Sequence, residues 1–317
     1  MLLRGLSLDL KVLPLRFTLR AVDPLRFPPS GPANALRGMI GLALRAAVCR
    51  PECASPALCP QRRTCPYARL FDPLPENLPP GFRNPPRPYV LRTLEQGRRT
   101  LQPGESWSFD LYLFDTRPPR LSGPLLASLR AVSQQGLGLG RGRAELIRAD
   151  VLDFAAQPAH PLDTAAEPRI LTLPLAPLQE PVRRVRIRFV TPTELKQAGQ
   201  IAPEADFRVL FARLRDRVST LRALYGDGPL PVDFQALGSR AAAIRLVRSH
   251  LAAVRASRRS SRTGQVHPLG GFTGEAEYEG DLGEFLPFLR AGWWTGVGRQ
   301  TVWGKGAIQT EVLDPHS

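Results

Sequence analysis

The feature that most constrains the fold of this chain is an order of elements that occurs twice. The first half reads as strand, helix, strand, strand, helix, glycine-rich segment and strand. Its strands fall at 6–21, 89–94, 106–114 and 144–152, and its helices at 33–49 and 123–135. Apolar residues recur with a period of two in the strands and at helical spacing in the helices. A change of phase beside Pro14 predicts a bulge or kink in the first strand.

The second half repeats this plan. A strand at 182–195 precedes an amphipathic helix at 207–225, in which apolar residues recur every three or four positions. The pattern then predicts a helix at about 234–256, strands at 264–269 and 271–280, a short helix at 282–291 and a last strand at 307–313. In both halves a glycine-rich segment separates the last helix from the last strand. The chain is therefore predicted to be an internal duplication.

The charge of the chain indicates a polyanionic partner. The 317 residues carry a formal net charge of +15, and all but three of the basic residues are arginines. Guanidinium groups bind phosphate with two hydrogen bonds and stack on bases, which favours nucleic acid over membrane lipid. A GC-rich genome also raises arginine content, but it accounts poorly for the excess of charge. No apolar run approaches the roughly 20 residues of a membrane span, and no signal peptide is evident, so a cytoplasmic location is expected.

The closing glycine-rich segment carries a resemblance to a known family. "GVGRQTVWGKG", residues 296–306, follows the pattern Gly-φ-Gly-x5-Gly-φ-Gly, in which φ is usually hydrophobic and Lys305 departs from that preference. It resembles the closing loop of the RAMP superfamily of CRISPR-associated proteins. "HPLGGFTGEAEYEG" and "TPTELK" resemble segments of the repeat-processing endoribonucleases in that superfamily. The resemblance is most specific over 182–313 and is architectural before that.

The resemblance implies an α+β fold of two tandem ferredoxin-like (RRM-like) βαββαβ domains, in agreement with the element order. The expected N-terminal domain spans 1–160, with a cysteine-rich insertion at 49–66 and a proline-rich connector at 71–88. A linker at 161–180 leads to the C-terminal domain at 181–317, whose glycine-rich loop covers 292–306.

The resemblance also implies an activity. Members of the family bind the repeat of precursor CRISPR RNA and cleave it without a metal cofactor. The ribose 2′-OH attacks the adjacent phosphate and leaves a 2′,3′-cyclic phosphate. CRISPR repeat RNA is the implied partner, together with other CRISPR effector subunits. The residues expected to bind RNA lie in the arginine-rich run and the closing loop: Arg255, Arg258, Arg259, Arg262, Gly296, Gly298, Arg299, Gly304, Lys305 and Gly306.

The catalytic residues are less well defined by the sequence. The family's usual histidine lies on or just after the first helix, and 33–49 contains none. Of the four histidines, His250 is expected in the middle of a helix, and His267 in a polar loop is the candidate acid or base. Arg37, Arg262 and Lys305 are candidates for stabilising the phosphorane charge. The missing histidine keeps open the alternative of a non-catalytic RAMP subunit that holds guide RNA.

Three alternating arginines at 184–188 resemble a phosphate-binding face, but a structural role is favoured. In a ferredoxin-like sheet the first strand lies antiparallel beside the third, which here carries alternating glutamates at 275–279. Opposite charges facing each other across neighbouring strands stabilise a sheet by about 0.2–1 kcal/mol per pair. The sequence therefore predicts a charge ladder between the two strands.

All four cysteines fall within seventeen residues, in the spacing C-x3-C-x5-C-x5-C: Cys49, Cys53, Cys59 and Cys65. Clustered thiols in a cytoplasmic protein more often bind metal than form disulfides. A structural Zn²⁺ with four thiolate ligands is expected, with an iron–sulfur cluster as the alternative. Free thiols packed as small apolar groups stay open, as does a metal-cluster protein that docks on DNA or on a partner.

Overall fold

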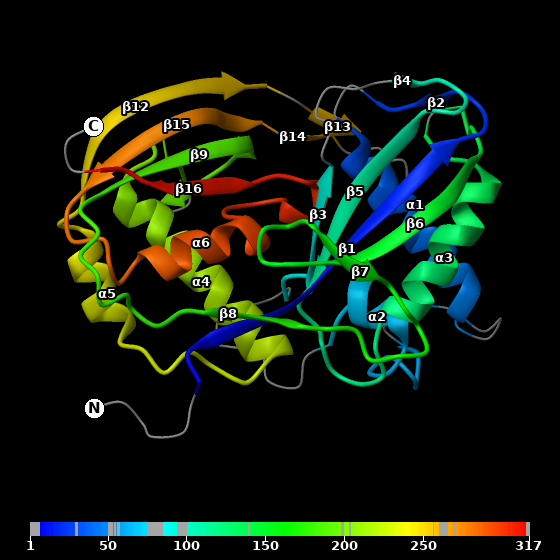
Figure 1. Cartoon of the computed structure of the whole chain (residues 1–317), viewed down its shortest axis with the longest axis horizontal. Coiled ribbons are helices and arrows are strands. Elements are labelled where there is room, and N and C mark those ends of the chain that lie inside the picture. The colour runs from blue at the N-terminus through cyan, green and yellow to red at the C-terminus, as the bar shows by residue number, and fades with distance from the viewer. Residues whose placement is uncertain are drawn as a thin grey trace. The chain divides into compact units, whose positions relative to one another are not determined.

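The computed structural model describes residues 7–28, 31–49, 53, 55, 58–74, 85–93, 100–138, 140–197, 200–202, 204–255, 257–259, 266–268 and 270–314. The chain divides into two compact units. The N-terminal domain comprises Lys11–Leu171 and Leu224–Asp227, and the C-terminal domain comprises Met1–Leu10, Thr172–Ala223 and Gly228–Ser317. Each has the alternation of strands and helices that the sequence predicts (Figure 1).

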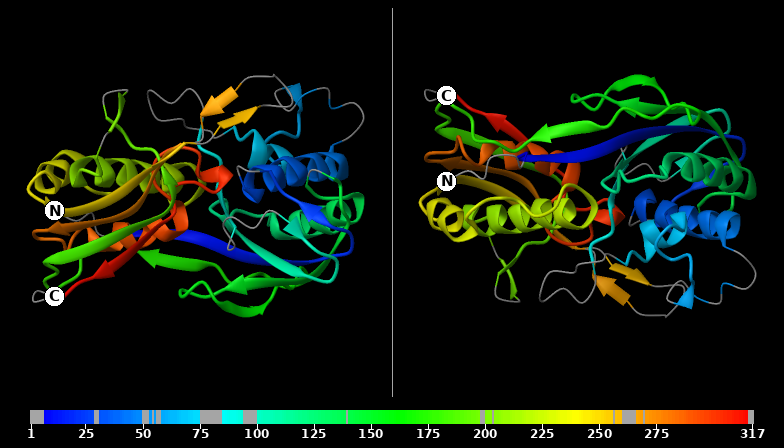
Figure 2. Two further views of the ribbon diagram at one scale, coloured as in Figure 1. Left: turned by 90° about the horizontal axis from the view of Figure 1, so that it is seen from above. Right: turned by 90° about the horizontal axis from the view of Figure 1, so that it is seen from below.

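The N-terminal domain is a ferredoxin-like sandwich. Its elements are β1 (Asp9–Ala21), β2 (Leu25–Arg26), α1 (Pro32–Val48), α2 (Pro66–Phe71), β3 (Tyr89–Thr93), β4 (Thr100–Leu101), β5 (Ser106–Leu113), α3 (Ser122–Gln135), β6 (Ala144–Leu152) and β7 (Pro158–Pro161). The main sheet has the order β3-β5-β1-β6-β7, and β8 (Leu171–Pro174) also pairs with β1. Helices α1 and α3 lie on one face of this sheet (Figure 2). Aromatic rings fill the core, with Phe17 and Phe109 5.5 Å apart between centroids.

The bulge in the first strand is not beside Pro14. The pairing of β1 with β5 runs without a shift from Leu13 to Arg20. The register shift lies between Thr18 and Leu19, on the side of β1 that pairs with β6. Pro14 lies opposite Tyr112 of β5, and the register of β1 with β6 begins one residue later, at Leu15.

The C-terminal domain has the same fold, with the sheet order β12-β15-β9-β16. Its elements are β9 (Arg184–Thr193), β10 (Lys196–Gln197), β11 (Gln200–Ile201), α4 (Phe207–Tyr225), α5 (Phe234–Ala241), β12 (Arg245–Val254), β13 (Ser257–Arg259), β14 (Val266–Pro268), β15 (Gly271–Glu279), α6 (Leu286–Thr295), a 3₁₀ turn (Thr301–Trp303) and β16 (Ile308–Val312). Helices α4 and α6 lie on one side of these strands (Figure 1). The predicted apolar stripe of α4 forms the core, where Phe211 lies 4.6 Å from Phe285 between ring centroids.

The prediction of a long helix at about 234–256 is wrong. Only Phe234–Ala241 is helical, and Arg245–Val254 forms β12, the second strand of the fold. The apolar residues of this segment follow neither a clear period of two nor a clear helical spacing, so period alone does not distinguish a helix from an exposed edge strand. His250 therefore lies on a strand and not within a helix.

Candidate nucleic-acid interface

The closing glycine-rich loop is a tight, internally bonded turn between α6 and β16. Four glycines have positive φ: Gly296 (65°), Gly298 (76°), Gly304 (78°) and Gly306 (70°). The Val297 N–H donates to the Gly306 carbonyl over 2.9 Å, and the Gly306 N–H donates to the Pro192 carbonyl over 3.2 Å. Some of the backbone N–H groups of this loop are therefore already hydrogen-bonded to carbonyl groups of the same domain.

Two of these glycines are required by close approach of backbone to backbone. A Cβ at Gly298 would lie 2.3 Å from the Glu194 carbonyl oxygen. A Cβ at Gly306 would lie 2.0 Å from the Val297 carbonyl oxygen. No side chain fits at either distance, and the positive φ adds backbone strain for any other residue. The packing of the loop on the end of β9 thus explains part of its glycine content without a ligand.

The loop presents two basic side chains in different environments. The Arg299 guanidinium is half-exposed, and its Nη1 lies 3.0 Å from Oε1 of Glu194. Lys305 is only 8% exposed, and burial lowers the pKa of its ammonium group. A buried ammonium group with a lowered pKa is suited to proton transfer or to stabilising a developing anion.

Part of the arginine-rich run belongs to β13, which pairs with β14. Strands β13 and β14 pair so that Arg258 lies opposite His267 in the backbone register. Arg255 is exposed at the end of β12. Arg262 and the side chains of Arg258, Arg259 and His267 lie outside the described residues. RNA binding by the run and catalysis by His267 therefore stay predictions.

Arg37, the remaining candidate for charge stabilisation, belongs to the N-terminal domain. It lies half-buried on α1, with its guanidinium carbon 5.8 Å from the centroid of the Phe71 ring. Tyr89 lies nearby; burial raises the pKa of its hydroxyl, and the charge of Arg37 opposes that rise. His267, Arg262 and Lys305 belong to the C-terminal domain.

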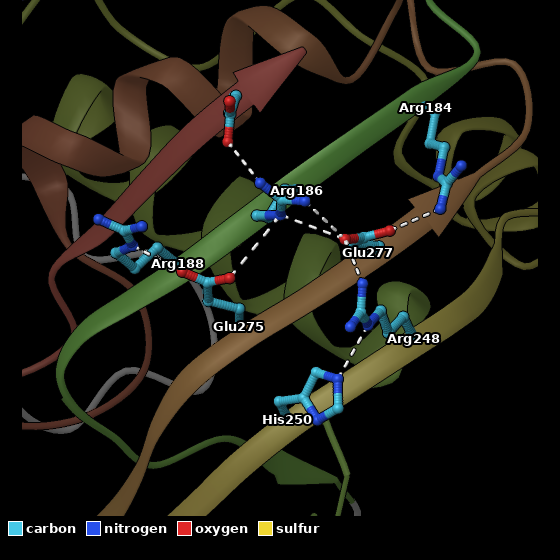
Figure 3. A network of polar contacts seen from close by, with 8 residues as sticks. Arg184, Arg186, Arg188, Arg248, His250, Glu275 and Glu277 are labelled. Atoms are coloured by element: carbon cyan, nitrogen blue, oxygen red, sulfur yellow. Dashed lines mark hydrogen bonds and ion pairs between the residues drawn. The ribbon is translucent and has the colours of Figure 1, made fainter. Parts of the chain in front are cut away.

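The predicted charge ladder is confirmed. In the register of β15 with β9, Glu275 faces Arg188, Glu277 faces Arg186 and Glu279 faces Arg184. Figure 3 shows the resulting network. Both oxygens of Glu277 accept hydrogen bonds, from Arg184 Nη2 over 2.7 Å and from Arg186 Nη2 over 2.9 Å. The three arginines of β9 are thus paired with carboxylates and carry little free charge for RNA.

The ladder extends onto both neighbouring strands, which sequence reasoning missed. Arg248 of β12 lies 3.9 Å from Glu277, and its Nε donates to Nε2 of His250 over 2.8 Å. Glu311 of β16 accepts from Arg186 over 3.1 Å. The error over β12 hid this extension, because a helix would not place Arg248 and His250 on the sheet. Glu277 is 4% exposed; burial opposes its ionisation, but the hydrogen bonds from Arg186 and Arg184 hold its pKa below the ordinary value.

The four cysteines are free and half-buried. Cys49 caps the C-terminus of α1, and Cys65 occupies the N-cap of α2. Burial, with the neighbouring thiols of Cys59 and Cys49, raises the pKa of Cys53 to about 11. Among the residues that the structure describes, no group of three or more potential ligands is arranged to hold a metal ion. The zinc and iron–sulfur expectations stay predictions.

Comparisons with known proteins agree with this architecture. A family model described as an N-terminal domain matches residues 10–171, and the model of the CRISPR-associated endoribonuclease Cas6 matches residues 187–308. No curated protein matches. A Cas6 product complex is 20% identical, with a TM-score of 0.58, and the match covers 94% of this chain and 99% of that one. Thermus thermophilus Cas6 is 18% identical, with a TM-score of 0.55 and coverage of 97% and 100%. In a partial Cas6-RT-Cas1–Cas2 complex, one chain is 13% identical with a TM-score of 0.60, covering 98% of this chain and 47% of that one.

The duplicated ferredoxin-like fold and its closing glycine-rich loop define a RAMP-type protein. The Cas6 model ends at Ile308 and so includes the whole of that loop. Residues 187–308 match the Cas6 family of CRISPR-associated endoribonucleases, and these matches support a CRISPR repeat-processing endoribonuclease. No helix in the described part of the chain is long and apolar enough to span a membrane.

Proposed function

We propose that this protein cleaves precursor CRISPR RNA within its repeats, by attack of a ribose 2′-OH on the adjacent phosphate and without a metal cofactor in the reaction. The observation that carries the proposal is the Cas6 match over residues 187–308. The buried Lys305 within the matched loop supports it, because its environment suits a group that acts on a charged transition state.

The reaction requires a base for the 2′-OH, an acid for the 5′ oxygen that leaves, and cations for the phosphorane charge. The O2′–P bond forms as the P–O5′ bond breaks, which leaves a 2′,3′-cyclic phosphate and a 5′-OH. Lys305 is assigned to the charge of the phosphorane, with Arg37 and Arg262 as further cations. His267 is assigned to proton transfer. Arg255, Arg258 and Arg259, with Arg299, hold the flanking phosphates.

A second candidate is a subunit that binds guide RNA without cutting it. The described helix α1 carries no histidine, although the resemblance places the family's usual catalytic histidine on or after that helix. A chain of the partial Cas6-RT-Cas1–Cas2 complex matches this chain over less than half of its own length. Because that matched chain belongs to a complex with Cas1 and Cas2, assembly with other CRISPR proteins is part of this alternative.

The two candidates differ in one assay. The protein is incubated with repeat RNA in excess EDTA, and binding and cleavage are followed on the same samples. Cleavage at one position per repeat supports the enzyme. Tight binding with intact RNA supports the scaffold, and equal affinity for DNA of the same sequence contradicts both.

A further inference from the structure

The N-terminal domain has its own glycine-rich loop, at residues 136–142, in the position that the closing loop occupies in the C-terminal domain. It connects α3 to β6, as residues 296–306 connect α6 to β16. We infer that this loop and the groove beside it form a second RNA site, which binds the phosphate backbone of a strand extending from the repeat. The inference rests on the proposed function and adds to it a surface that the reaction itself does not require.

The backbone of the loop is fixed by contacts within the N-terminal domain. The Leu137 N–H donates to the Gly142 carbonyl over 2.7 Å. A Cβ at Gly138 would lie 2.3 Å from the Arg26 carbonyl oxygen, and one at Gly142 would lie 2.4 Å from the Pro24 carbonyl oxygen. The loop is thus packed directly on the segment that contains β2, and its shape does not depend on a ligand.

Arg141, directly before Gly142 in the loop, has a φ of +51°, a backbone conformation that residues other than glycine adopt at a cost of about 1–3 kcal/mol. Glycines surround it at 138, 140 and 142, but this position carries a long cationic side chain. Backbone strain of this kind is found often at binding sites, where the function of the side chain compensates for the cost of the strained backbone.

A groove of about 500 Å³ lies beside the loop, between α3 and the start of β6. Arg130 and Gln134 of α3 line one side, and Arg143 and Glu145 line the other. None of its described lining residues is aromatic. A groove without aromatic rings offers no surface for stacking bases, so its polar groups suit the sugar–phosphate backbone of a strand.

The arginines here differ from those of the charge ladder. Arg26, Arg130 and Arg141 are exposed, and their side chains make no hydrogen bond or ion pair within the described residues. Arg143 is paired with Asp23, with Nε and Oδ2 2.8 Å apart, and Arg20 lies 4.0 Å from Glu145. Five arginines therefore meet two carboxylates around the loop and groove. Arg130 lines the groove, whereas Arg26 and Arg141 belong to the adjoining loop and the segment on which it packs. Such exposed guanidinium groups can bind phosphate oxygens with two hydrogen bonds each.

The test is RNA affinity measured against salt, with the full chain and repeat RNA that carries single-stranded extensions. We expect the double variant Arg130→Glu/Arg141→Glu to bind at least about tenfold more weakly. The slope of log K against log[KCl] should fall by about 1.4, since each lost phosphate contact on a single strand contributes roughly 0.7. The matched control is Arg45→Glu/Arg169→Glu, which makes the same charge change at two exposed arginines of this domain outside the loop and groove. It should keep the salt slope of the wild type.

A second variant guards against effects on folding. Arg141→Gly removes the guanidinium and also relieves the positive φ, so it should raise the unfolding temperature while it weakens RNA binding. This inference alone would be overturned if the wild type binds and cleaves repeat RNA and both loop variants bind it with the same affinity and the same salt slope as the wild type. Failure of the wild type to bind repeat RNA would overturn the proposed function and this inference with it.

Discussion

Glu277 forms ion pairs with more arginines than any other carboxylate of the charge ladder, namely Arg184, Arg186 and Arg248. Its side chain is 5% exposed, whereas Arg184 and Arg186 are 28% and 30% exposed. We expect Glu277→Gln to lower the free energy of unfolding by about 2 kcal/mol, because it leaves two partly buried guanidinium groups short of a charged acceptor. Glu311→Gln is the matched control, since its carboxylate is 60% exposed and should contribute at most about 0.5 kcal/mol. Urea denaturation of the three proteins measures this, and equal losses would contradict the assignment.

The same residue gives a pH dependence with a defined sign. The folded-state pKa of Glu277 is below its ordinary value of 4.5, because the hydrogen bonds from Arg186 and Arg184 outweigh the effect of burial. Its stabilisation is therefore full above the pKa of the unfolded chain and is lost as pH falls through the folded value. The difference in stability between the wild type and Glu277→Gln should shrink as pH is lowered from 6 toward 3. A constant difference over this range would show that the effect of the substitution does not come from the charge.

Lys305 is the residue on which the proposed chemistry can be tested most simply. We expect Lys305→Ala to reduce single-turnover cleavage by about 100-fold, with a much smaller effect on RNA affinity. If the protonated ammonium is required, the wild-type rate falls as pH rises through the lowered pKa of Lys305. Lys305→Arg keeps the charge and should move this decline to higher pH. Lys11→Ala, which removes an exposed pair with Asp227, is the control.

At the scale of elements, the closing loop is a test of backbone geometry. Gly298→Ala and Gly306→Ala each place a methyl group against a carbonyl oxygen at positive φ, so each should destabilise the protein by about 2 kcal/mol or more. Gly38, in the exposed part of α1, has open space around it, and Gly38→Ala should instead stabilise by about 0.5–1 kcal/mol. Thermal unfolding of the three variants checks the contrast, and a neutral Gly298→Ala would contradict the close approach to Glu194.

The cysteine segment tests the remaining element-scale prediction. If the four thiols hold Zn²⁺, the purified protein should contain one equivalent of zinc, and Cys53→Ser should lose it with a fall in unfolding temperature. Elemental analysis of the full chain gives the answer directly. Absence of zinc and of iron with acid-labile sulfide, with four titratable thiols, would leave the cysteines as packed free thiols.

The sequence was sufficient for the fold where apolar periods were strong. Strand β6 and helix α3 match their predicted ranges closely, and the charge ladder between β15 and β9 was predicted from the ferredoxin-like strand order together with the alternating charges of the two strands. The prediction failed at β12, an edge strand whose exposed faces leave no regular apolar period. It also misplaced the bulge in β1, because register depends on the partner strand β6 and not on Pro14.

The candidate site was less predictable for a related reason. The glycines of the closing loop indicated an unusual backbone conformation. The sequence did not indicate that the Glu194 carbonyl would lie against Gly298, or that the Glu194 carboxylate would pair with Arg299. Nor does a glycine pattern report that Lys305 is buried, which depends on the packing of the whole loop. Residue types were therefore predictable, and their partners were not.

At the scale of the whole molecule, the chain contains two copies of one fold, and these copies use arginine in different ways. The ladder of the C-terminal sheet neutralises its arginines with glutamates, whereas the loop of the N-terminal domain leaves Arg130 and Arg141 unpaired within the described residues. In this chain of net charge +15, some arginines are therefore neutralised by neighbouring glutamates and others are not.

The most direct measurement compares two repeat RNAs that differ by one oxygen atom. One carries an ordinary ribose before the scissile phosphate, and the other carries a 2′-deoxyribose at that position. With excess EDTA present, we expect equal binding, cleavage of the ribose substrate only, and an upstream product whose mass corresponds to a 2′,3′-cyclic phosphate. Cleavage of the deoxy substrate, or cleavage that stops on adding EDTA, would contradict this expectation.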